Sequence, residues 1–360
     1  MVTGTTRSAV LSVAAGLVLL FAFTTVLNST YRAVRHGKAE KLYQHGVALA
    51  KAGHNAEAAG EFRAAIVFAH DDAQYRLALA RSLMALGLWN EAESHLSELS
   101  EDDPTNGLVN LMLAQIAERD GRSTQAVTFY HRAIFGYWPE KPLENRIEAR
   151  FQLVDLLART GQQKQVIPEL LELADEVPDA DLELRERVGR LFLANGSPEH
   201  AAEQFKAIVS EHPHDAVPYQ GLGDAEFALA DFGAARSAYR TAARYKPEDV
   251  SLLHRILLSD DILELDPTVV RLTATERYAR AKRLAERTLA SFQACATVPA
   301  DLNTKAQNLI KANPRRRRDG DTLALINVAQ QLWKARQVAC STIPVRDEAL
   351  PAVMTRISKQ

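Results

Sequence analysis

The sequence has 360 residues, of which 47% are apolar and 24% are charged, as in an ordinary folded protein. This composition excludes a largely disordered chain, and abundant alanine and leucine with few β-branched or aromatic residues favour helices over sheets. The net charge of −2 is unevenly distributed, because residues 39–249 carry 21 basic and 34 acidic side chains, whereas residues 1–38 and 250–360 are both basic. We therefore expect an acidic helical body between two basic ends, where anionic partners or lipid headgroups would bind.

The N-terminal segment contains one long apolar run. Residues 9–27 are nearly all apolar, and a helix of that length spans roughly 28 Å, close to the hydrocarbon core of about 30 Å. We expect a tail over residues 1–8, a single transmembrane helix over residues 9–31 and a basic juxtamembrane stalk over residues 32–38. A cleaved signal peptide is the alternative, although no small-residue cleavage site follows the run.

The orientation of this anchor depends on the flanking charges. Arg7 precedes the run, whereas Arg32, Arg35, Lys38 and Lys41 follow it. The positive-inside rule then places the rest of the chain in the cytoplasm. A short N-terminal tail that stays inside while a long domain is exported would give the opposite side, so both sides stay open, with the cytoplasmic side favoured.

Glycine recurs at near-constant intervals through the middle of the chain. Successive members are 34, 34, 40 and 35 residues apart, and Ala230 continues the series 34 residues later. The glycines are Gly53, Gly87, Gly121, Gly161 and Gly196. A 34-residue period resembles that of the tetratricopeptide repeat, a helix–turn–helix unit.

Aligning the chain on these positions gives six units with small residues at the eighth and twentieth positions, and aromatic residues or leucine at the twenty-fourth. About six extra residues around Trp138–Asn145 should bulge from one inter-repeat turn without breaking the stack. The resemblance implies an all-α fold, a right-handed superhelical α-solenoid of helix–turn–helix units with a concave binding face. The six units are residues 39–72, 73–106, 107–146, 147–181, 182–215 and 216–249.

The concave face of this family is formed by the first helix of each unit, and the resemblance implies a groove for a protein or peptide partner. The family's carboxylate clamp is missing, because its Lys and Asn positions hold residues such as Tyr43 and Val47. The candidate groove residues are polar and carry both signs of charge. They are Gln74, Arg81, Gln115, Glu118, Asp155, Glu186, Arg190, Gln220 and Asp224.

Beyond Pro247 the repeat fades, and we expect residues 250–360 to form a degenerate seventh unit and a C-terminal helical cap. Thr273 and Glu276 have the spacing of a capping box that opens a helix to about Ala294. Shorter patterns predict helices over 302–312 and 322–340. The apolar side of the last one should contain Leu323, Ile326, Leu332 and Trp333.

A basic loop, Arg315, Arg316, Arg317 and Arg318, stands between those helices. Four adjacent arginines could contact anionic lipid or nucleic acid. However, no aromatic side chains interleave them as single-strand binding would need, and Asp319 partly offsets their charge. A solvated loop is the favoured interpretation.

No phosphate-loop, dinucleotide, zinc-protease or nucleophile-elbow motif is present in the sequence, and no cofactor or metal site is predicted. Cys295 and Cys340 could form a disulfide in an oxidising compartment, but two separate buried core residues are the favoured interpretation. We expect a membrane-tethered, non-catalytic scaffold that binds a partner protein or peptide. The alternatives are an accessory subunit or enzyme with chemistry in the C-terminal helices, or an anion binder acting through the basic loop.

Overall fold

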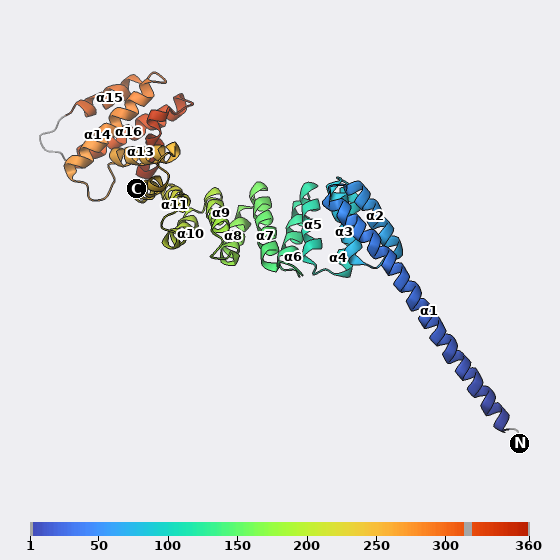
Figure 1. Cartoon of the computed structure of the whole chain (residues 1–360). Coiled ribbons are helices and arrows are strands. Elements are labelled where there is room, and N and C mark those ends of the chain that lie inside the picture. Colours follow the sequence, from blue (N-terminus) through green and yellow to red (C-terminus); the bar gives the residue numbers. More distant parts are fainter. Residues whose placement is uncertain (1–2, 313–318, 359–360) are drawn as a thin grey trace. The chain divides into compact units, whose positions relative to one another are not determined.

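The computed structural model describes residues 3–312 and 319–358; in the first helix, side chains are described for residue 17 and from residue 20 onward. Within these residues the chain is helical, apart from turns and one isolated backbone bridge, so the expected all-α class is confirmed. Figure 1 shows the succession of helices along the chain. The helices group into two compact units, Met1–Glu169 and Leu170–Gln360.

The first unit begins with one very long helix, which is followed by shorter helices in pairs. An eighth helix, α8 (Gln163–Glu176), contains the boundary between the units. The others are α1 (Thr3–Lys51), α2 (Asn55–Phe68), α3 (Ala73–Ala85), α4 (Trp89–Asp102), α5 (Gly107–Arg119), α6 (Ser123–Ile134) and α7 (Pro142–Arg159).

The second unit continues the pairs and ends in a group of longer helices. A single 3-10 turn (Val345–Asp347) precedes the last helix. The helices are α9 (Leu182–Ala194), α10 (Pro198–Glu211), α11 (Ala216–Ala228), α12 (Phe232–Tyr245), α13 (Val250–Leu265), α14 (Ala274–Gln293), α15 (Ala300–Lys311), α16 (Asp319–Ala339) and α17 (Ala349–Ser358).

The periodic glycines lie in the turns between paired helices, where the backbone adopts the left-handed conformation. Gly121, for example, has a φ of 75°, and a Cβ added there would meet no atom within 4 Å. Conformation rather than crowding therefore explains glycine at this turn. Ala230 occupies the corresponding turn between α11 and α12 with a φ of 61°, which is a strained value for a residue with a side chain.

Close crossing of paired helices explains the small residues at the eighth position. A Cβ on Gly46 would lie 2.6 Å from Cε1 of Phe62, which is buried in the core between α1, α2 and α3. Likewise, a Cβ on Gly223 would lie 2.4 Å from Cε1 of the buried Tyr239. In both of these repeats the aromatic ring at the twenty-fourth position thus lies directly against the backbone of the first helix.

The start of the inserted segment after α6 is held by backbone hydrogen bonds and by one buried side chain. Tyr137 donates its backbone N–H to the Thr105 carbonyl at 2.7 Å, and its carbonyl accepts from Gly107 at 3.0 Å. The buried Trp138 donates from Nε1 to the Ala133 carbonyl at 2.8 Å, and a Cβ on Gly107 would lie 2.4 Å from its indole ring. Residues 142–145 of the insertion form the start of α7, whereas residues 139–141 are exposed between α6 and α7.

The transmembrane anchor predicted over residues 9–31 is not supported. Where side chains are described, no helix holds an apolar stretch long enough to cross a membrane. The described end of that range contains polar residues, and Thr24 and Thr25 bond back to the carbonyls of Phe21 and Ala22 at 2.9 and 2.7 Å. The side chains of residues 9–16, 18 and 19 lie outside the description.

The C-terminal helices form one hydrophobic core that includes Phe232 of α12, Ile262 of α13 and Leu350 of α17. The capping box is confirmed, since Thr273 and Glu276 exchange hydrogen bonds at the start of α14. The prediction for Leu323 is wrong, because it is 57% exposed while Leu325 and its neighbours face the core.

The interpretation of two separate cysteines is also wrong. Cys295 and Cys340 form a disulfide with a Cα–Cα distance of 5.9 Å. Beside it, the buried Arg336 donates from Nε to Ser291 Oγ and from Nη2 to the Thr342 carbonyl, both at 2.8 Å. The ends of α14 and α16 are therefore joined by a covalent bond and by a buried cation with neutral partners.

Candidate functional site

The nine groove residues predicted from the sequence all lie on the first helix of a pair. In the first unit they are on α3, α5 and α7, and in the second on α9 and α11. Most of them contact other side chains of the chain itself. Gln74, for instance, donates to the Tyr43 hydroxyl of α1 at 3.0 Å.

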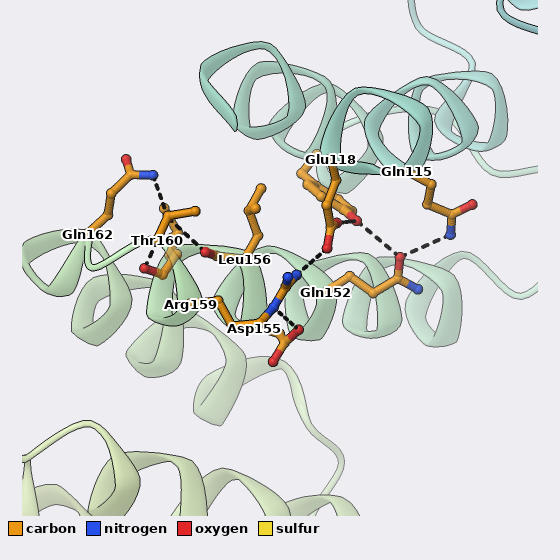
Figure 2. A network of polar contacts seen from close by, with 10 residues as sticks. Gln115, Glu118, Gln152, Asp155, Leu156, Arg159, Thr160 and Gln162 are labelled. Atoms are coloured by element: carbon orange, nitrogen blue, oxygen red, sulfur yellow. Dashed lines mark hydrogen bonds and ion pairs between the residues drawn. The ribbon is translucent and has the colours of Figure 1, made fainter. Parts of the chain in front are cut away.

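Side chains of α5, α6 and α7 form a continuous set of hydrogen bonds, here named the α5–α7 network (Gln115, Glu118, Tyr130, Gln152, Asp155 and Arg159). Gln115 donates to Gln152 at 3.0 Å, and the Tyr130 hydroxyl donates to Glu118 at 2.5 Å. Arg159 donates to Glu118, and also to Asp155 at 2.9 Å. Figure 2 shows Gln115 and Glu118 pointing from α5 toward Gln152 and Arg159 on α7.

The chemistry of this network fixes the direction of its hydrogen bonds. Tyr130 is buried, and burial together with the bond to Glu118 raises the pKa of its hydroxyl well above the usual value. Bonds to Glu118 and Asp155 raise the pKa of Arg159 as well. Tyr130 therefore remains a donor and Arg159 a cation, so Glu118 accepts from both.

The second unit contains a smaller set of the same kind, here named the α11–α13 network (Asp224, Tyr239 and Arg255). The Tyr239 hydroxyl donates to Asp224 at 2.8 Å, and Arg255 donates to Asp224 and, at 3.2 Å, to Tyr239. Burial raises the pKa of Asp224, although the bonds from Tyr239 and Arg255 oppose that shift. Burial also raises the pKa of Tyr239.

The remaining groove residues differ in how far they are engaged. Glu186 is buried beside Arg190, with a nitrogen–oxygen distance of 3.4 Å, and burial raises the pKa of the carboxyl. Arg81 is exposed on α3, and no ion pair or hydrogen bond joins it to another described residue. Gln220 likewise has no such contact within the described part of the chain. These two side chains are free to bind an external group.

Several residues of the networks were missed by sequence reasoning, which treated the twenty-fourth position only as a core filler. Tyr130 and Tyr239 fill the core and also present a hydroxyl to the first helices, as the two bonds to carboxylates show. The signal was tyrosine where other units have phenylalanine or leucine. The basic loop Arg315–Arg318 lies outside the described residues.

Comparison with known proteins agrees with the fold. A family model described as the tetratricopeptide repeat matches residues 77–142. Two curated proteins named peroxisomal targeting signal receptor are similar. The one from Kluyveromyces lactis is 28% identical over 211 residues, 56% of this chain and 35% of that protein. The one from Eremothecium gossypii is 26% identical over 209 residues, 56% and 34% of the two chains. This chain thus spans about a third of either relative.

Solved structures with the same kind of repeat are also similar. A tetratricopeptide repeat protein from Parabacteroides merdae has 15% identity and a TM-score of 0.41, over 81% of this chain and 99% of that one. Part of a repeat protein from Cytophaga hutchinsonii has 14% identity and a TM-score of 0.47, over 67% and 93%. Residues 77–142 of the present chain thus match the tetratricopeptide repeat.

Proposed function

We propose that the chain binds a polypeptide partner on the face formed by the first helices of its repeats, and that α3, α5 and α7 supply the part of this face that recognises the partner in the first unit. Such a role needs no catalytic group. Both curated relatives are named as receptors for a targeting signal, which fits a binding role.

The arrangement of polar side chains carries this proposal. The α5–α7 network holds carboxylate, amide and guanidinium groups in fixed positions, so little side-chain entropy remains to be lost on binding. On the neighbouring α3, Arg81 offers a cation with no partner among the described residues. A peptide backbone could bond to the ordered amides while one of its acidic groups pairs with Arg81.

Binding is tested with peptides selected on the full chain from a random displayed library. For a selected peptide, Arg81→Ala should raise the dissociation constant by about tenfold, as expected for the loss of one charged hydrogen bond. Arg132→Ala is the matched control, because Arg132 is an exposed arginine on the second helix α6 without an ion pair among described residues. Equal losses in both variants, or no peptide with saturable binding, would contradict the proposal.

The disulfide in the second unit indicates the kind of compartment in which the protein folds. Disulfides persist in oxidising compartments and are rare in the cytosol, so the crosslink disagrees with the cytoplasmic side favoured by the flanking charges. We propose that the chain folds in an oxidising compartment. Thiol alkylation of the native protein before and after reduction checks this, since two labels on the unreduced chain would contradict it.

A further inference from the structure

A trough lies between α15 and α16, two helices of the second unit that follow the repeats in the chain. Its cavity volume is about 600 Å³, which is within the range of ligand sites. Two lysines and four amide side chains line it, and Leu309 and Ala324 supply an apolar part of the wall. No acidic residue is among the side chains lining it.

The two lysines share one end of the trough. Lys305 on α15 donates to the Gln331 side chain on α16 at 3.1 Å. Lys334 follows Gln331 by three residues, so it lies on the same face of α16, about one turn further on. Neither ammonium group forms an ion pair with a described residue. Two like charges thus face one cavity without a counter-charge, and an anion bound there would reduce their repulsion.

A second cavity of the same unit is lined by charges of both signs. The cavity between α13 and α14 has a volume of about 410 Å³, but Arg283 and Arg287 line it together with Asp261, Glu264 and Glu286. Asp261 also pairs with Arg287 at 2.5 Å. That cavity therefore contains side chains of both signs and one ion pair, whereas only basic charges line the trough.

The rest of the trough fits an extended peptide better than a small anion. Asn308 and Asn327 offer both donors and acceptors, which suit a peptide backbone, and Leu309 offers an apolar contact for a side chain. From Ala324 to Lys334 the wall runs along ten residues of helix, about 15 Å. That length equals roughly four to five residues of extended chain.

We propose that the α15–α16 trough binds an acidic polypeptide segment, with a carboxylate between Lys305 and Lys334 and an apolar side chain near Leu309. The site is separate from the first-helix face, and its test does not depend on peptide binding there. Several consecutive residues of a partner would be held, with carboxylate specificity at one end and apolar contact at the other.

The experiment measures fluorescence anisotropy of a labelled peptide, Gly-Glu-Glu-Gly-Leu-Gly, on the full chain. We expect saturable binding with a dissociation constant below about 1 mM, and binding at least about tenfold weaker for the peptide with Gln in place of Glu. The Lys305→Gln/Lys334→Gln variant should lose about tenfold in affinity. The Lys164→Gln/Lys246→Gln variant removes the same charge from exposed positions elsewhere and should stay within twofold of the unchanged chain.

Equal losses in the two double variants would show general charge attraction and would overturn the proposal, as would equal binding of the Glu and Gln peptides. Displacement of the peptide by an equimolar amount of inorganic phosphate would overturn the assignment to a polypeptide. Absence of saturable binding below about 1 mM would overturn it as well. Circular dichroism of both variants, expected to match the unchanged chain, confirms that a loss does not come from unfolding.

Discussion

The α5–α7 and α11–α13 networks use the same tyrosine position in different ways. Tyr130 donates to Glu118, and Gln152 offers a second acceptor at 3.4 Å. Tyr239 donates to Asp224 alone among the described residues. In the α5–α7 network the positive charge of Arg159 is shared between two carboxylates, those of Glu118 and Asp155. The polar side chains of a repeat can therefore be held either by several alternative acceptors or mainly by a single carboxylate.

The largest expected difference follows from removing that acid. Asp224→Ala leaves the buried Tyr239 hydroxyl without its acceptor and should destabilise the second unit by about 2–3 kcal/mol. Glu118→Ala leaves the alternative acceptors Gln152 and Asp155, and should cost the first unit about 1 kcal/mol. Hydrogen exchange of the backbone amides in α11–α13 and α5–α7 measures each effect separately.

A matched control is Asp175→Ala, which removes an exposed acid of α8 and should change protection by less than about 0.5 kcal/mol. Equal destabilisation by the two network variants would show that the alternative acceptors of the α5–α7 network do not function.

Removing a hydroxyl should have a smaller effect with a clear pH dependence. Tyr239→Phe and Tyr130→Phe should each cost about 1 kcal/mol near neutral pH. The folded-state pKa values of both tyrosines are raised, and that of Tyr75 is raised to about 12 by burial and its bond to Glu40. A raised pKa gives a stability contribution that is complete below the unfolded pKa of about 10 and is lost as the pH rises through the folded pKa.

Unfolding by denaturant between about pH 8 and 11 checks this dependence. The unchanged chain should lose stability above about pH 10, and each Phe variant should lose less with rising pH. Parallel pH curves for the variants and the unchanged chain would show that the tyrosine hydroxyls are not coupled to folding.

The α5–α6 and α11–α12 turns also differ, and substitutions in them should change the free energy of unfolding by about 1 kcal/mol or less. Gly121→Ala in the α5–α6 turn should destabilise by about 1 kcal/mol, because φ is 75° there and no contact compensates. Ala230→Gly in the α11–α12 turn should stabilise by about 0.5 kcal/mol, since it relieves a φ of 61° but also removes a methyl group packed on the core. Thermal unfolding measures both, and the same sign for the two changes would refute the conformational explanation.

The smallest effect concerns the exposed ion pairs of the α5–α7 network. Arg159 is 54% exposed, so Arg159→Gln should cost only about 0.5 kcal/mol at low salt and almost nothing at 1 M salt. Measuring stability at both salt concentrations checks this. A loss that persists at high salt would mean that Arg159 acts through packing instead of charge.

Much of the repeat fold could be predicted because its signals are local. The glycine of each turn depends on one φ angle, and the small eighth position depends on one contact between paired helices, so both recur at fixed spacing. The burial of Trp138 could not be predicted in the same way, because its site lies beside Gly107, far back in the sequence.

The last helix and the side-chain contacts depend on distant parts of the chain. Helix α17 was missed, because its short apolar pattern gains stability only from packing with residues far back in the sequence. Arg356, for example, pairs with Asp266 at 3.2 Å and donates to the Ala230 carbonyl at 3.0 Å. For the candidate site, the repeat period predicted which polar residues lie on the first helix of each pair. The hydrogen-bond partner of each residue could be seen only in the structure.

The Cys295–Cys340 bond closes a ring of chain that contains α15, α16 and therefore both walls of the trough. With a sequence separation of 45 between the cysteines, such a ring restricts the unfolded chain by about 4 kcal/mol in the loop-entropy description. A single backbone cut inside the ring leaves two fragments that stay covalently attached, while a cut between α12 and α13 separates them. A chain cut once inside the ring would therefore keep both lysine-bearing helices in one covalent molecule until the disulfide is reduced.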